Sequence, residues 1–467
     1  MLNQLKESKL IKSSFWYIIG NFFVKGISFI TVPLFVRITT QAEYGLINNY
    51  TSFVSIFSIL VGLSLNASVN NASFDFKKDI SNFMSSILSL ATLSLIFFLF
   101  FGNFYFLIFD NFFDMNQLIF NLMIIQSFST FLVTFLQALY TINFQHFKFL
   151  KISLLSTALN ICASVLLMQT VFSYDKYLGR VLGGAVGLLI CGVFIYLSIA
   201  IKGKERFNIT YWKYALRISL PLIPHSLASI MLAQFDRIMI NFSLGSNEAG
   251  IYSYISNIAI ILNVVWISIN NSWVPWFYEQ MSKKKYLNIK KVSSLYSLFF
   301  TIISMAFMVI SVDLAKIMAD SSYYSGIPLV IPICLGYFFQ FLYSLPVNIE
   351  FYLKKTGYIS FGTLFSAIVN IVLNLIFIPV YGILAAGYTT AFTYFLLFLF
   401  HYNWAKRIIS KQLFDTKLLM ILTILMILFS FTILYLIDYF WIRYGFTLAL
   451  ILMIGVLAYI LNKKTNK

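Results

Sequence analysis

The sequence predicts an all-α polytopic membrane protein with about 14 transmembrane helices. Apolar residues make up 60% of the 467 residues, and charged residues make up only 10%. A soluble domain needs roughly 25% charged residues to cover its surface, so most of this surface must face lipid. The apolar residues also form runs of about 20 without polar alternation, which favours membrane-spanning helices over barrel strands.

The charges and turn residues that interrupt the apolar runs mark the individual spans. The first run follows Lys12 and is too long for the apolar core of a secretory signal, and no small-residue cleavage site follows it. We therefore expect it to be retained as the first span. The predicted spans are residues 13–36, 45–66, 80–101, 117–140, 152–171, 181–201, 218–242, 250–273, 292–312, 327–349, 359–380, 383–400, 418–437 and 444–461.

The basic residues support this division independently, because cytoplasmic loops carry an excess of Lys and Arg. If the N-terminus is cytoplasmic, 26 of the 33 basic residues fall in the two termini or in inner loops. We therefore predict that both termini are cytoplasmic. The net charge of +17 is explained by this topology and by contact with anionic lipids, not by nucleic acid. The exceptions are Arg37, Lys176, Arg180, Lys316 and Arg443 in outer loops, and Lys25 and Arg237 within spans.

An internal repeat divides the spans into groups of six, six and two. The chain resembles itself at a spacing of about 205 residues. Six spans per repeat give the two lobes the same orientation, as in transporters whose substrate site lies between the halves. We predict an N-terminal lobe at 1–206, a C-terminal lobe at 207–410 and two additional helices with a tail at 411–467. The matched positions are Glu43 to Gly45 with Glu248 to Gly250, Asn66 with Asn271, Asn160 with Asn370, and Gly179 and Gly184 with Gly382 and Gly387.

The repeated glycines and asparagines are interpreted first as structural residues. Small residues let membrane helices approach closely, and asparagine forms hydrogen bonds between helices. They support the architecture and not a particular chemistry.

The intramembrane charges are the main candidates for function. Lys25 lies near the middle of the first span, roughly 18 Å from either surface. A lysine stem does not reach water over that distance, so Lys25 must face a watery cavity or a buried partner.

The seventh span carries the other charged pair, Asp236 and Arg237. Adjacent helical residues point about 100° apart, so one can line a cavity while the other contacts a neighbouring helix. We expect Arg237 to contact substrate, and Asp236 to be a structural partner or a cation sensor. His225, beside Pro221 and Pro224, is either a proton-coupling residue or an ordinary satisfied polar residue.

Several stretches of the two halves carry a family resemblance, namely Phe235 to Ile240, Leu244-Gly245, Glu248 to Tyr252 and, in the first half, Ala42 to Gly45. They resemble polysaccharide exporters of the multidrug/oligosaccharidyl-lipid/polysaccharide (MOP) flippase superfamily. The branch that the chain looks most like is the Wzx-type flippases of O-antigen and capsule repeat units. The family's helix number, duplicated lobes and cytoplasmic N-terminus agree with the predicted topology.

The resemblance implies a flippase of the bacterial cytoplasmic membrane that moves undecaprenyl-diphosphate-linked oligosaccharides from the inner to the outer leaflet. Alternating access through a cationic central cavity would lower the cost of carrying the anionic diphosphate through lipid. Lys25 and Arg237 are the expected contacts, since both bind phosphate. The implied partners are the lipid-linked cargo, membrane lipids and the polysaccharide polymerase machinery. No cofactor or metal is expected, and proton and sodium coupling both stay open.

Two alternatives remain. A multidrug extruder of the same superfamily usually places acidic residues in its cavity, whereas these spans hold one acid, Asp236, and two bases. A polysaccharide polymerase or membrane glycosyltransferase generally needs a sizeable outer loop, whereas the longest predicted one, residues 102–116, contains no basic residue. No paired-carboxylate or nucleophile site stands out. We therefore predict a transporter and not an enzyme.

Overall fold

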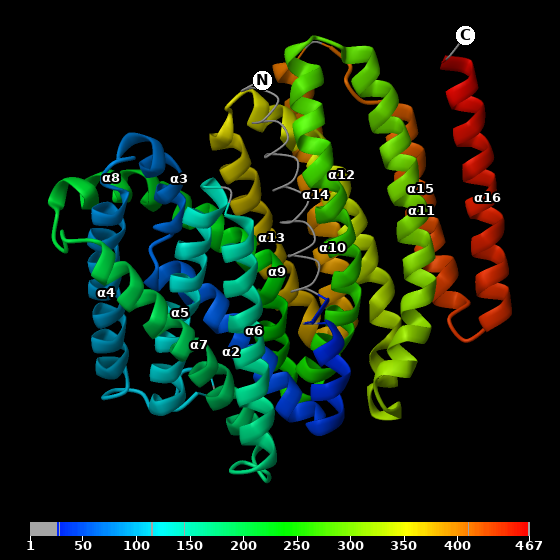
Figure 1. Cartoon of the computed structure of the whole chain (residues 1–467). Coiled ribbons are helices and arrows are strands. Elements are labelled where there is room, and N and C mark those ends of the chain that lie inside the picture. The colour runs from blue at the N-terminus through cyan, green and yellow to red at the C-terminus, as the bar shows by residue number, and fades with distance from the viewer. Residues whose placement is uncertain (1–25, 28, 114, 144, 410, 466–467) are drawn as a thin grey trace. The chain divides into compact units, whose positions relative to one another are not determined.

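The computed structural model describes residues 26–27, 29–113, 115–143, 145–409 and 411–465, which are helical almost throughout (Figure 1). In this part of the chain, 12 helical segments are long and apolar enough to cross a membrane. Two shorter apolar helices, Phe29–Ile38 and Phe440–Val456, lie where the first and last spans are predicted. The predicted fold class is therefore confirmed.

The helices form two compact units. The first contains Ile38–Phe242, and the second contains Phe29–Arg37 and Ser243–Lys467. The first unit thus includes most of α9, although the repeat places residue 207 at the start of the second lobe. The predicted boundaries rest on that repeat and stay a prediction.

The first unit holds α2 Gln41–Val61, α3 Asn66–Asp75, α4 Ile80–Tyr105, α5 Gln117–Ile142, α6 His146–Gln169, α7 Lys176–Lys202, α8 Ile209–Ser219, the 3-10 turn η1 Leu220–Leu222 and most of α9 Ile223–Leu244. The second holds α10 Ser246–Ser282, α11 Tyr286–Met318, the 3-10 segment η2 Ser321–Leu329, α12 Val330–Tyr352, α13 Thr356–Tyr381, α14 Ile383–Ile408, α15 Thr416–Tyr435 and α16 Phe440–Thr465.

Glu43, one of the repeated residues, caps the start of α2. Thr40 Oγ1 accepts a hydrogen bond from the backbone N–H of Glu43 at 3.2 Å, and Glu43 Oε2 accepts one from the Thr40 N–H at 2.8 Å. This reciprocal cap satisfies two backbone donors that the helix itself leaves unpaired. The second carboxylate oxygen, Oε1, accepts from the backbone N–H of Lys176 at 3.0 Å. One side chain therefore fixes the beginnings of both α2 and α7.

The predicted span 45–66 ends at a break between α2 and α3. Gly62 lies against the Phe131 ring so closely that a Cβ there would come within 2.3 Å of it. The next two residues, Leu63 and Ser64, have φ values of 49° and 50°, which residues other than glycine rarely adopt. This left-handed turn ends α2 and redirects the chain into α3.

Close packing of α6 against α7 depends on glycine. A Cβ added to Gly183 would lie 2.4 Å from Ser164 Cα, and one added to Gly187 would lie 2.6 Å from the Leu159 carbonyl carbon. Because both obstacles are backbone atoms, no side-chain movement relieves them. Glycine at every fourth residue therefore lets the two helix backbones touch.

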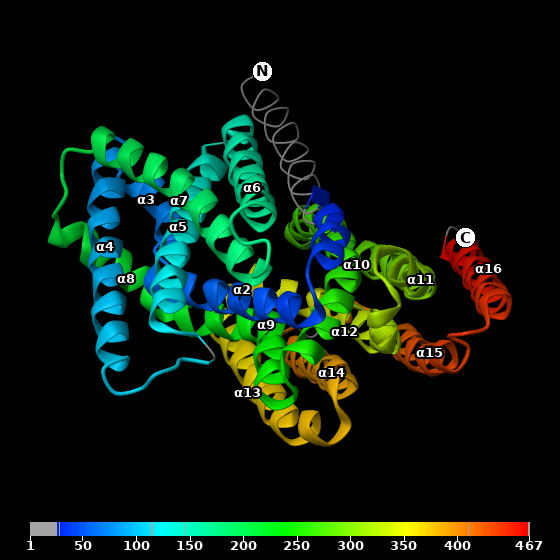
Figure 2. The ribbon, with the colours of Figure 1, turned by 90° about the horizontal axis from the view of Figure 1, so that it is seen from below.

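The last two helices attach to the second unit through α11. Both α15 and α16 pack against α11, and α15 also contacts α12. Figure 2 shows α15 and α16 at the edge of this unit, beyond α11. Their place outside the repeated set of helices stays a prediction.

Candidate ionisable and polar sites

The charged pair predicted in the seventh span lies near the end of α9. Asp236 and Arg237 are buried, as is every residue from there to Asn241. Six consecutive residues cover all faces of a helix, so α9 is enclosed on every side at this level. Arg237 Nη1 donates to Gln234 Oε1 one turn earlier. Contact of Arg237 with cargo stays a prediction, and Lys25 lies outside the described residues.

The other predicted residue on this helix, His225, follows the break that the prolines were expected to introduce. The 3-10 turn η1 separates α8 from α9, because Pro221 lacks an N–H donor and its ring conflicts with the preceding helical turn. His225 is partly buried, and its Nδ1 has no hydrogen-bond partner within the described chain. Its coupling role stays a prediction.

A basic cluster that sequence reasoning missed joins α6 to α7. Arg180 Nη1 donates to Asn160 Oδ1 at 3.0 Å and to Ser164 Oγ at 2.7 Å. Asn160 Nδ2 in turn donates to the Gly184 carbonyl at 3.0 Å. Arg180 was placed in an outer loop because the apolar run begins at Val181. In the structure α7 begins at Lys176, so the guanidinium belongs to a helix and lies against its neighbour.

The corresponding helices of the second unit carry a neutral cluster. Asn370 Nδ2, on α13, donates to Thr390 Oγ1 on α14 at 3.0 Å. Asn374 Nδ2 donates to Asn370 Oδ1 at 3.2 Å, and the Thr389 hydroxyl donates to Asn374 Oδ1. Asn160 and Asn370 therefore both join one helix to the next, as the structural interpretation of the repeated asparagines predicts.

A second missed site is a buried acid–base pair in the second unit. Glu350 on α12 and His401 on α14 both have fully buried side chains, with Glu350 Oε1 2.6 Å from His401 Nδ1. Each residue lies one position beyond the end of its predicted span, so both were placed in loops. The signal available was the neighbouring Lys354 and Lys355, which indicates that the helix continues past the apolar run to an interface.

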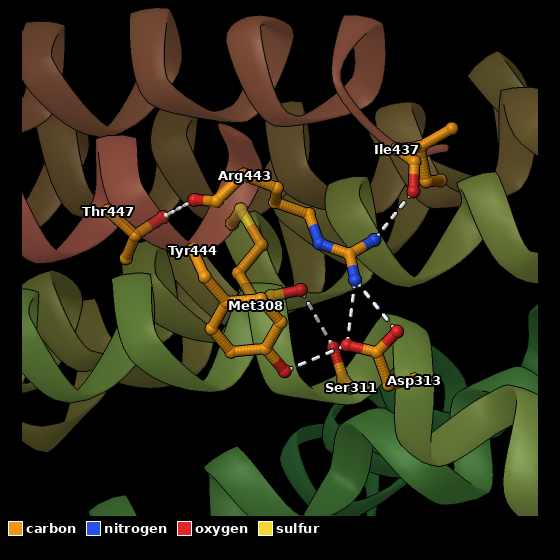
Figure 3. Close-up of polar contacts among 7 residues, drawn as sticks. All are labelled: Met308, Ser311, Asp313, Ile437, Arg443, Tyr444 and Thr447. Atoms are coloured by element: carbon orange, nitrogen blue, oxygen red, sulfur yellow. Dashed lines mark hydrogen bonds and ion pairs between the residues drawn. The ribbon is translucent and has the colours of Figure 1, made fainter. Parts of the chain in front are cut away.

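A third missed site clamps α16 to α11 (Figure 3). Arg443 Nη2 reaches both carboxylate oxygens of Asp313, at 2.8 and 2.7 Å, while Nη1 donates to the Ile437 carbonyl at 2.6 Å. The Tyr444 hydroxyl also donates to Asp313, at 2.8 Å. The Arg443 side chain is only 1% exposed. Because a buried charge needs a partner, this ion pair explains how a basic residue counted among the outer loops is accommodated.

Together these features define a multi-pass membrane protein in which Arg180, the Glu350–His401 pair and the Arg443–Asp313 pair each join one helix to another. Residues 10–281 match the family described as polysaccharide biosynthesis proteins, and this match covers more than half of the chain. The protein belongs to that family.

Individual relatives agree. An uncharacterized membrane protein of Haemophilus influenzae is 25% identical over 405 residues, which cover 81% of this chain and 94% of that protein. Among solved structures, the lipid II flippase MurJ in an inward closed conformation has a TM-score of 0.73 at 18% identity, covering 94% of this chain and 98% of that one. An inward-facing multidrug resistance MATE transporter of the MOP superfamily has a TM-score of 0.60 at 12% identity, covering 82% and 98%.

The family match confirms the predicted relation to polysaccharide biosynthesis proteins, and the two solved structures confirm the predicted fold. The fold is shared with a lipid II flippase and a multidrug resistance transporter.

Proposed function

We propose that this protein is a flippase that moves undecaprenyl-diphosphate-linked oligosaccharide repeat units from the inner to the outer leaflet of the bacterial cytoplasmic membrane. The cargo would supply O-antigen or capsular polysaccharide synthesis. The observation that carries the proposal is membership of the polysaccharide biosynthesis family together with a fold shared with a lipid II flippase. Both termini are proposed to be cytoplasmic.

The physical requirement of such a cargo is a cationic path. A diphosphate that enters lipid unaided leaves its charge unpaired, at a cost of many kcal/mol. Lys25 and Arg237 are the basic residues predicted within the spans. In the proposed mechanism they neutralise the diphosphate in a central cavity that opens alternately to each side. Arg237 is buried in this structure, so its contact with cargo requires a conformation in which the end of α9 becomes accessible.

Deletion of the gene followed by analysis of lipid-linked intermediates tests the function. A flippase leaves undecaprenyl-linked repeat units on the cytoplasmic side of the membrane. Unpolymerised units on the outer side would identify a polymerase instead. A deletion strain that is sensitive to drugs but makes normal surface polysaccharide would favour the alternative function, a multidrug extruder. That function is the one named for the MATE structure of the same fold.

Complementation with single variants tests the proposed residues. Lys25→Ala and Arg237→Ala are expected to reduce surface polysaccharide while the protein still reaches the membrane, and Arg237→Lys is expected to restore part of it. Lys283→Ala, which removes an exposed base paired with Glu279, is the matched control. Normal polysaccharide in both alanine variants and in the double variant would exclude the cavity roles.

A further inference from the structure

The pair formed by Glu350 and His401 differs from the other ionic contacts in the described chain. Both side chains are 0% exposed, whereas the acid of the Arg443–Asp313 pair is 24% exposed and the surface pairs are more open still. The pair joins α12 to α14, which pack closely along their length. It lies at the end of both helices that the basic loops predict to be cytoplasmic.

The proton count of this pair is fixed by its burial. With one shared proton the pair has no net charge, whether the proton resides on the carboxylate or makes the imidazole cationic. Loss of that proton leaves a negative charge without a counter-ion, and gain of a second leaves an isolated positive charge. Either state is strongly disfavoured out of water. A closed pair that carries no net charge therefore holds one proton.

The pair is also incompletely satisfied. Glu350 Oε2 and His401 Nε2 are both buried, and neither has a hydrogen-bond partner among the described residues. Each buried polar atom without a partner costs free energy. A contact that only joined the two helices would be more stable without these two atoms. Both atoms would gain partners if water entered.

The room around the imidazole is set by a glycine. A Cβ added to Gly362, on α13, would lie 2.7 Å from His401 Nε2. The unpaired nitrogen therefore faces a helix that has no side chain at this point. Separation of α13 from α14 at this end would expose that nitrogen to water.

We propose that Glu350 and His401 form a proton-binding site that couples protonation to opening of the second unit at its predicted cytoplasmic end. In the closed state the pair keeps its proton. When the ends of α12, α13 and α14 separate, the O–H or N–H bond breaks, the proton passes to water, and the carboxylate left behind is hydrated. An alkaline cytoplasm thus favours the open end and an acidic one favours the closed end. As a coupling site, it rests on the proposed transport function.

The titratable groups around the site leave this proton count unchanged. The Tyr343 ring, from α12 itself, lies 5.1 Å from the imidazole, and a phenol is neutral at physiological pH. The charged groups on neighbouring elements have other contacts: Lys406 lies over the Tyr402 ring, and Lys290 of α11 is paired with Asp415 before α15. On α13, the residue that faces the imidazole is Gly362.

Infrared difference spectroscopy of the purified full-length protein in liposomes tests proton binding without any cargo. Raising the pH should remove a protonated-carboxyl band or an imidazolium band in the wild type. Glu350→Gln should abolish this change, whereas His401→Gln should shift a carboxyl band to another pH or abolish an imidazolium band. Glu279→Gln is the matched control, because that carboxylate is exposed and paired with Lys283. The same band change in wild type and Glu350→Gln would overturn the site.

A transport assay with undecaprenyl-diphosphate-linked oligosaccharide then tests coupling. The wild type should respond to an imposed pH gradient, and both pair variants should lose that response while retaining gradient-independent movement. An unchanged gradient response in folded Glu350→Gln protein would show that the pair is structural only. If the wild type binds the proton but moves no cargo, the proposed function fails and the proton site stands. If it moves cargo but no group at the pair titrates, the proton site alone fails.

Discussion

The α6–α7 contact of the first unit and the α13–α14 contact of the second each contain an asparagine at the repeated position, one beside a charged group and the other among neutral groups. Asn160 bonds to the Gly184 carbonyl and also accepts from Arg180, whereas Asn370 bonds to the Thr390 hydroxyl. The residue after the first repeated glycine is Arg180 in one unit and Ile383 in the other.

This difference shows that the helix contact itself does not require a charge. Amide and hydroxyl groups suffice in the second unit. In the first unit the Arg180 guanidinium also needs hydrogen-bond acceptors, which Asn160 and Ser164 supply. Polar side chains must therefore be present at both positions. The charge is therefore an addition to a shared framework.

The largest expected effect comes from the glycine contact. Gly183→Ala places a Cβ against the Ser164 backbone, at 2.4 Å, whereas Gly387→Ala meets the Pro332 ring at 2.9 Å. Overpacking that backbone cannot relieve should cost about 3 kcal/mol, and the ring contact should cost less. Unfolding by detergent titration in mixed micelles measures both. Because Pro332 belongs to α12, equal losses would mean that the α6–α7 and α12–α14 contacts tolerate separation equally.

Removal of the charge tests whether the first unit depends on it. Arg180→Ala deletes two hydrogen bonds made by a charged donor and leaves Asn160 Oδ1 and Ser164 Oγ without that donor. We expect a loss of about 2 kcal/mol by the same titration. Arg180→Gln should recover part of this loss, because neutral donors serve the second unit. A wild-type stability for Arg180→Ala would show that the guanidinium does not stabilise the first unit.

The paired asparagines give a smaller and more direct comparison. Asn370→Ala removes neutral hydrogen bonds, which in membrane proteins average about 0.6 kcal/mol each. Asn160→Ala also removes two hydrogen bonds, but one of them comes from the charged Arg180, and such bonds are about twice as strong as neutral ones, so its loss should be the larger. Equal losses would mean that the charge of Arg180 is satisfied elsewhere. In the Arg180→Gln background, Asn160→Ala should then lower the free energy of unfolding by about as much as Asn370→Ala does in the wild type.

The smallest effect is expected for Ser164→Ala. Its hydroxyl accepts from Arg180 and donates to the Asn160 carbonyl at 2.6 Å, and the helix carbonyl keeps its backbone partner. A loss near 0.6 kcal/mol is expected. A double-mutant cycle with Arg180→Ala should give a coupling of similar size, and zero coupling would remove Ser164 from the cluster.

Much of the fold follows from the sequence, because lipid leaves few options for a run of 20 apolar residues. The third predicted span, 80–101, and α4 Ile80–Tyr105 begin at the same residue. The errors share one cause. An apolar run marks the hydrocarbon layer, whereas a helix continues into the interface, where α7 begins at Lys176 and α12 ends at Tyr352.

The candidate sites were harder to predict for the same reason. Polar residues just outside an apolar run were placed in loops, and their helical partners were missed. Glu350 and His401 are 51 residues apart, and nothing in either local stretch indicates the other. Asp236 and Arg237 were found because they interrupt a run. A charge hidden inside lipid is visible in a sequence, but a pairing at the rim of the membrane is not.

The clamp between Arg443 and Asp313 has a consequence for biogenesis. The two residues are 130 positions apart in the chain, so the carboxylate on α11 leaves the ribosome well before its counter-ion. At typical synthesis rates it waits roughly 7 to 26 s. During this interval Asp313 depends on water and headgroups at the predicted outer surface. Insertion of α16 then supplies the counter-ion, so a chain that stops before Arg443 leaves the Asp313 carboxylate without the partner it has in this structure.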